Sequence, residues 1–91
     1  LGFSIIEVKA KPRKEMRRVV SEVAAGLEWR PVGDRLRLAV PDANGRAAEL
    51  TQALRTRLEE EKLEVRLLRS ERPGMEDVFV HLVMKQRRKD E

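Results

Sequence analysis

The stretch EWRPVGDRLRLAV, residues 28–40, decides the fold, because it predicts two antiparallel strands joined by a tight turn. Gly33 and Asp34 suit a two-residue hairpin turn that has glycine at its first central position. Pro31 cannot donate a hydrogen bond to a neighbouring strand, so the first arm is expected at an edge of the sheet. The second arm alternates as a strand does, with Leu36, Leu38 and Val40 on one face and Arg35, Arg37 and Ala39 on the other.

Periodic apolar residues predict further elements on both sides of this hairpin. Residues 3–10 have the pattern of a central strand that is apolar on both faces near its start. Pro12 suits the first position of a helix, and Gly26 suits its left-handed end. A second helix follows the PDANG turn, and residues 63–68 alternate as a last strand. The apolar stripes of the two helices are Met16, Val19, Val20, Val23, Ala24 and Leu27, and Ala47, Leu50, Leu54 and Leu58.

The order of these elements predicts an α+β fold of the ferredoxin-like βαββαβ type. Right-handed crossovers give a four-stranded antiparallel sheet in the order 4-1-3-2, with two helices on one face. This order leaves Phe3, Ile5 and Leu68 on the other face, where apolar side chains need a cover. We expect an additional C-terminal helix to supply that cover.

This final helix lies within RPGMEDVFVHLVMKQ, residues 72–86, and is apolar over much of its circumference. Glu76 and Asp77 lie in its first turn, where carboxylates stabilise unpaired N–H groups. One side is expected to dock on the bare sheet face and carries Met75, Val78, Phe79 and Leu82. The apolar residues that point away from that side are either a face for a partner or scattered exposed residues: Val80, Val83 and Met84.

Composition limits the classes of function that are open to the chain. The 91 residues suffice for one domain, expected to span residues 1–91 with an ordered core at 3–84 and a frayed basic tail at 85–91. The chain has no cysteine and a single histidine, which argues against a disulfide framework and a zinc site of the usual kind. We therefore expect that this chain binds neither a metal nor a cofactor.

Charge and hydropathy bear on the location of the protein. No apolar run is long enough to cross a bilayer and no leader opens the sequence, so a soluble intracellular protein is expected. The chain begins at Leu1 without an initiator methionine, which favours a piece of a longer protein. The net charge of +4 permits attraction to nucleic acid or anionic lipid, but the acidic and basic residues are interleaved.

The segment RPGMEDVFVHL, residues 72–82, resembles RPSLEDVFLxLTG, the ending of the C-terminal accessory domain on ATP-binding subunits of ABC-2 type exporters. GDRLRLAV, the helix after it and LEVRLL resemble the hairpin, helix and last strand of the same domain, so the resemblance covers nearly the whole chain. The residues that match the ending are Arg72, Pro73, Glu76, Asp77, Val78, Phe79 and Leu82. Gly74 stands where the family has serine, Met75 and Val80 stand where it has leucine, and Val83-Met84 stand where it has Thr-Gly.

The resemblance implies a non-catalytic interaction or regulatory domain that follows an ATPase domain. Its implied partners are its own upstream ATPase domain, the second ATP-binding subunit of a dimer and the membrane subunit of the transporter. ATP and Mg²⁺ would be bound by the upstream domain, since this chain has no GxxxxGK[ST] loop. The implied location is the cytoplasmic side of the inner membrane, reached through the transporter.

Two other functions share this fold and stay open at this point. Ferredoxin-like sheets with basic surfaces bind RNA by stacking bases on sheet aromatics, but Phe3, Trp29 and Phe79 do not form such a set, so nucleic acid is the less favoured partner. A small-molecule sensing domain usually needs a glycine-bearing loop at a dimer interface, and no convincing one is present. His81 has no nucleophile beside it and is expected on the surface, while Trp29 is expected to close the end of the core.

Overall fold

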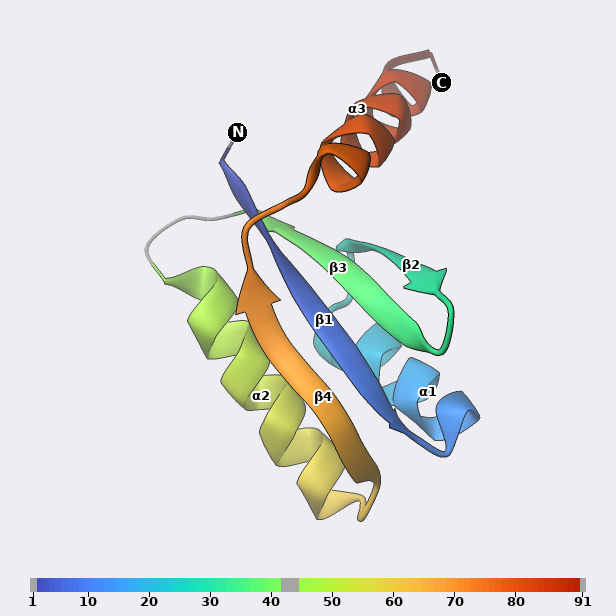
Figure 1. The fold of residues 1–91 in the computed structure, drawn as a ribbon, viewed down its shortest axis with the longest axis vertical. Coiled ribbons are helices and arrows are strands. Elements are labelled where there is room, and N and C mark those ends of the chain that lie inside the picture. The colour runs from blue at the N-terminus through green and yellow to red at the C-terminus, as the bar shows by residue number, and fades with distance from the viewer. Residues whose placement is uncertain (1, 42–44, 91) are drawn as a thin grey trace.

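A computed structural model of the chain describes residues 2–41 and 45–90, with side chains up to Met84 in the last helix. Its elements are β1 (Phe3–Lys11), α1 (Arg13–Val23), β2 (Glu28–Val32), β3 (Arg35–Pro41), α2 (Arg46–Glu60), β4 (Glu64–Glu71) and α3 (Met75–Asp90) (Figure 1). The four strands form one antiparallel sheet in the order β2-β3-β1-β4, which confirms the α+β fold and the 4-1-3-2 order. α3 continues to Asp90, past residue 84, where the ordered core was expected to end; Glu91 lies outside the described residues.

The hairpin forms as its local sequence predicts. Gly33 has a φ of +63°, a left-handed conformation that residues with a side chain adopt with difficulty, and Val32 pairs with Arg35 directly across the turn. β2 is an edge strand, so the missing N–H of Pro31 costs the sheet no hydrogen bond to an outer neighbour.

The core lies between one face of the sheet and the helices α1 and α2. Along β1 and β3, the side chains that face α1 and α2 alternate with side chains that face the other way. Trp29 packs against the edge of this core, as predicted. Fully burying one leucine side chain in this core stabilises the fold by about 1.5 to 3 kcal/mol relative to leaving it exposed. The buried residues are Ile6, Val8, Ala10, Met16, Val19, Val20, Ala24, Leu36, Leu38, Val40, Ala47, Leu54 and Leu58.

β4 contains an irregularity that changes which of its residues face the core. Val65 pairs with Ala10 and Leu67 pairs with Lys9, so Arg66 is an extra residue in the ladder. A β-bulge of this kind reverses the alternation beyond it. Leu68 therefore packs against the core between sheet and helices, and the prediction that it lies on the opposite face is wrong.

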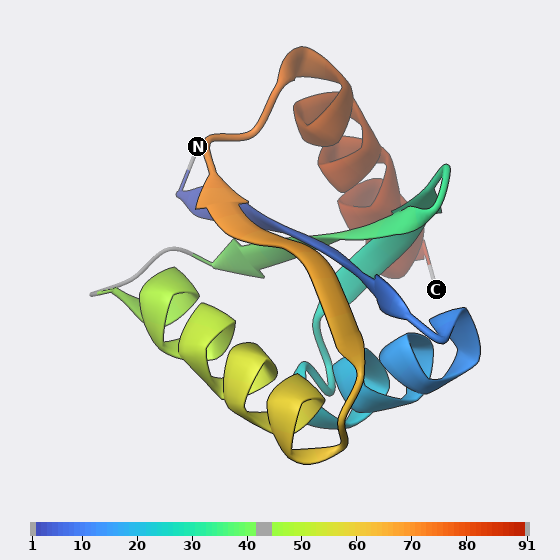
Figure 2. The ribbon, with the colours of Figure 1, turned by 60° about the horizontal axis from the view of Figure 1, so that its bottom comes forward.

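The sheet has helices on both faces. α1 and α2 cover one face, and α3 lies over the other, reached by the segment that leaves the end of β4 (Figure 2). Phe3, Ile5 and Glu7 of β1 alternate with the core residues and are themselves buried on the α3 side. The predicted cover over this face is present, although a different side of α3 forms it.

Candidate functional site

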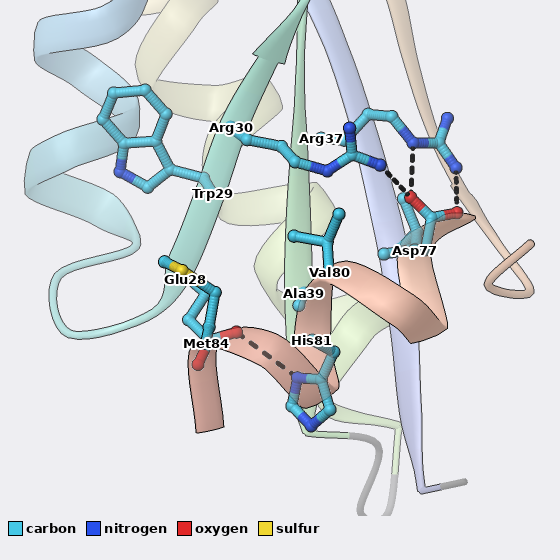
Figure 3. Close-up of a pocket in the computed structure, with 10 residues that line it drawn as sticks. Glu28, Trp29, Arg30, Arg37, Ala39, Asp77, Val80, His81 and Met84 are labelled. Carbon is cyan, nitrogen blue, oxygen red and sulfur yellow. Dashed lines mark hydrogen bonds and ion pairs between the residues drawn. The ribbon is translucent and has the colours of Figure 1, made fainter. Parts of the chain in front are cut away.

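α3 faces the sheet with the side that was expected to point away from it. Asp77, Val80, His81 and Met84 line a small cavity together with strand residues of the sheet (Figure 3). The side chains of Met75, Phe79 and Leu82 are 92%, 69% and 52% exposed. The prediction that these three residues dock the helix is therefore wrong. Val80, which was assigned to an outward face, is half-buried and lines the cavity, whereas Met84 lines the same cavity but is 37% exposed.

Asp77 joins α3 to the hairpin through a charged cluster. Its Oδ1 accepts hydrogen bonds from Arg30 Nη2 at 2.8 Å and Arg37 Nε at 3.0 Å, and its Oδ2 accepts one from Arg37 Nη2 at 2.7 Å (Figure 3). Oδ2 also accepts the backbone N–H of Gly74 at 2.9 Å, as the side chain at the third position of a capping box does. One carboxylate that is 6% exposed thus caps the helix and fastens it to β2 and β3.

Glu7 is the second carboxylate of this cluster and lies on β1 between the arginines of neighbouring strands. Its Oε1 accepts hydrogen bonds from Arg35 Nη1 at 2.7 Å and Arg69 Nη2 at 3.3 Å, and Oε2 accepts one from Arg37. The residue is 3% exposed. Arg37 also contacts Glu71 at 2.8 Å and is the guanidinium that links Glu7 with Asp77.

The two carboxylates are held as anions by these contacts. Hydrogen bonds from Arg37 lower the pKa of Asp77 to about 2, against the opposing effect of burial and with help from Gly74 and Arg30. Burial raises the pKa of Glu7, but the hydrogen bond from Arg35 and the charge of Arg37 outweigh it and leave the pKa below its usual value. Both groups are therefore charged near neutral pH. Carboxylates held as anions in this way stabilise the fold and are poorly suited to general acid–base catalysis.

His81 lies between α3 and the sheet rather than on the open surface where it was expected. Its ring stacks on Phe3 with centroids 4.4 Å apart and an interplanar angle of 26°. Its Nδ1 lies 3.3 Å from Oε2 of Glu28 on the edge strand β2. These contacts fix the middle of α3, one turn beyond Asp77.

Apolar contact under α3 is limited. A cavity of about 30 Å³ remains between the helix and the sheet, lined on its apolar side by Ile5, Ala39, Val80 and Met84. A space of this size holds about one water molecule and no metabolite. The polar and aromatic contacts of Asp77 and His81 thus fasten α3 beside a small apolar layer.

The outward side of α3 carries what we call the apolar stripe, defined as Met75, Phe79 and Leu82. These residues follow at steps of four and three, which places them on one line along the helix. The spacing is that of the seam of a coiled coil. Contiguous exposed apolar residues are uncommon on monomeric domains, and patches of this kind are often interaction sites.

The remaining motif residues have separate positions. Pro73 and Val78 are half-buried, and Val83 is exposed beside the apolar stripe. Glu76 is exposed and reaches Arg30 at 3.4 Å. Of the predicted motif, Asp77 is thus the buried member of the charged cluster, and Glu76 contacts the cluster from an exposed position through Arg30. Sequence reasoning did not connect Asp77 with Arg30 and Arg37, nor recognise Glu7 as the second carboxylate of the cluster. The alternation of Glu7 and Arg37 with core residues on β1 and β3 was the signal.

Within the described residues, no group of three or more His, Cys, Asp or Glu side chains could hold a metal ion. No helix of the described part is long and apolar enough to cross a membrane. Comparison of the chain with models of protein families, with curated proteins and with solved structures finds no match.

Proposed function

We propose that the chain is a non-catalytic interaction and regulatory domain that docks on a partner protein through the apolar stripe of α3. The observation that carries the proposal is the exposure of Met75, Phe79 and Leu82 on a helix that is otherwise held to its own sheet. Burying a phenylalanine and two other large apolar side chains at an interface removes much apolar surface from water, which favours association. An amphipathic helix with its apolar side outward suits either a groove or a second helix of the partner.

The resemblance of residues 72–82 supports a specific parent protein. We assign the domain to the ATP-binding subunit of an ABC-2 type exporter, following its ATPase domain on the cytoplasmic side of the inner membrane. The partners are then the upstream ATPase domain, the second ATP-binding subunit or the membrane subunit, and ATP with Mg²⁺ belongs to the ATPase domain.

The coding sequence upstream of Leu1 tests this assignment. We expect the preceding ~200 residues, the length of an α/β ATPase domain, to contain a phosphate-binding loop and a transporter signature motif. If the upstream sequence lacks both, the assignment to an ABC-2 type exporter is wrong, and the proposed interaction role is supported only by the exposed apolar stripe of α3.

One feature of the sheet face under α3 favours the interaction role over RNA binding. RNA-binding sheets of this fold present free aromatic rings to the bases, whereas Phe3 is covered by the His81 ring.

The double substitution Phe79→Asp with Leu82→Asp tests the docking surface. Since both side chains are exposed, we expect the free energy of unfolding to change by less than about 1 kcal/mol. We expect self-association in sedimentation, or co-purification with the parent subunit, to weaken at least tenfold, because charges placed on the apolar stripe would have to be buried at the interface.

Val32→Asp is the matched control, because Val32 is also an exposed apolar residue but lies on the hairpin. It should leave association unchanged. If the double variant associates as the unsubstituted chain does in both assays, the apolar stripe is not the docking surface.

A further inference from the structure

A basic groove lies at the end of the sheet away from α3. It is formed where β1 ends and α1 begins, beside the turn between α2 and β4, in the lower part of Figure 1. Its volume is about 650 Å³, far more than that of the cavity under α3. The residues that line it are Lys9, Ala10, Lys11, Pro12, Arg13, Asp34, Lys62 and Glu64.

The positive charge of this groove is only partly compensated. Lys9 pairs with Asp34 at 2.7 Å, and Glu64 contacts Arg66 at 3.2 Å. The other three cations of the lining, Lys11, Arg13 and Lys62, form no ion pair with any residue that the structure describes. Three cations that share one concavity repel each other, and an anion bound between them would relieve that repulsion.

Lys62 occupies a position that the backbone reserves for glycine. Its φ is +62°, and it stands at the left-handed residue of a Schellman motif that ends α2. The motif is complete, because the N–H of Leu63 donates to the carbonyl of Leu58 and the N–H of Lys62 donates to the carbonyl of Glu59, both at 3.0 Å. A lysine here strains the backbone where glycine would not, so a role for its side chain explains its presence better than stability does.

The first turn of α1 adds to the positive potential at this place. Arg13 is the first residue of α1, and no side chain caps the N-terminus there. The positive end of the helix dipole therefore lies beside the groove cations.

We propose that this groove binds a phosphate-class anion, held by Lys11, Arg13 and Lys62. Ammonium and guanidinium groups form charge-assisted hydrogen bonds with phosphate oxygens, and a phosphate dianion supplies enough acceptors for all three. The phosphate belongs either to a free phosphorylated small molecule or to the headgroup of an anionic lipid. This site is separate from the apolar stripe, so the two proposals fail independently.

The test compares Lys62→Gly with the unsubstituted chain. Glycine suits the backbone at position 62, so the melting temperature should rise by about 4 °C or more while the groove loses a cation. In NMR titrations with inorganic pyrophosphate, the backbone amides of Lys11, Arg13 and residues 62–64 should shift in the unsubstituted chain, and Lys62→Gly should bind about tenfold more weakly. A more stable fold with weaker binding separates a lost ligand contact from lost structure.

Arg46→Ala is the charge-matched control, because Arg46 is an exposed cation at the opposite end of α2 and lies outside the groove. It should leave pyrophosphate binding unchanged. Co-sedimentation with vesicles of equal parts phosphatidylcholine and phosphatidic acid distinguishes the two sources of the phosphate. If the vesicles retain the protein and Lys62→Gly reduces this retention, the ligand is a lipid headgroup. If pyrophosphate binds but the vesicles do not retain the protein, the ligand is a free phosphorylated molecule. The proposal is overturned if pyrophosphate shifts none of these amides, or if Arg46→Ala weakens binding as much as Lys62→Gly does.

Discussion

Replacing Glu7 by glutamine is expected to lower the free energy of unfolding by about 1 to 3 kcal/mol, because a buried acceptor of charged hydrogen bonds loses its charge. β1 lies between β3 and β4, and Glu7 is 3% exposed among arginines of both neighbours. Glutamine keeps the size of the side chain but removes the charge on which Arg35, Arg37 and Arg69 converge. Urea unfolding followed by circular dichroism measures the loss.

Glu71→Gln is the matched control for this variant. Glu71 contacts the same Arg37 at 2.8 Å, but its side chain is 32% exposed, so its loss should cost less than about 1 kcal/mol. If both variants lose the same small amount, the attraction around Glu7 is screened by solvent and Glu7 is not the buried centre of the cluster.

The sequence predicts the sheet well, because the signals that define it are local. The turn depends on Gly33, whose left-handed φ needs glycine, and the edge depends on Pro31, which lacks an N–H. The helices α1 and α2 each bury one continuous stripe at helical spacing. Each of these signals lies within a few residues and needs no knowledge of the rest of the chain.

β4 and α3 depart from the prediction because their orientation is decided by distant residues. The bulge at Arg66 is set by the register of β4 with β1, and the sequence of β4 itself contains no signal for it. A helical projection of α3 has apolar residues on two sides, and the larger apolar set wrongly predicts the docking side. The sheet face below, however, carries Glu7, Arg30 and Arg37, so an acidic residue on the helix is a better complement to it than Phe79 is.

This arrangement relates the charged cluster to the proposed docking. A helix held by a carboxylate and a stacked histidine does not need its largest apolar side chains for attachment to its own sheet. Met75, Phe79 and Leu82 are then available for a second surface. Any change that loosens the cluster would also change how α3 presents the apolar stripe, so under the proposed docking Asp77 would couple the attachment of α3 to the binding of a partner.

Asp77→Asn is expected to loosen α3 while the sheet stays folded. Asparagine keeps an oxygen that can accept the N–H of Gly74, so the variant removes the charge and spares the cap. The pKa of Asp77, lowered from 3.8 to about 2, corresponds to about 2 kcal/mol of stabilisation by its charged partners. Hydrogen exchange of α3 amides should quicken by a factor of ~30, whereas amides of Ile6 and Leu38 in the sheet should be protected as before.

The difference in α3 amide exchange between the unsubstituted chain and Asp77→Asn should depend on pH, in the direction set by the lowered pKa of Asp77. The folded pKa lies below the unfolded one, so the stabilisation by Asp77 is complete above about pH 5 and is lost as the pH falls toward 2. Exchange rates of α3 in the unsubstituted chain should therefore converge on those of Asp77→Asn in acid, after correction for intrinsic exchange. Glu76→Gln, at an exposed position on the same turn, should follow the unsubstituted chain throughout. A gap between the unsubstituted chain and Asp77→Asn that stayed constant down to pH 2 would mean that α3 is held by contacts other than the charge of Asp77.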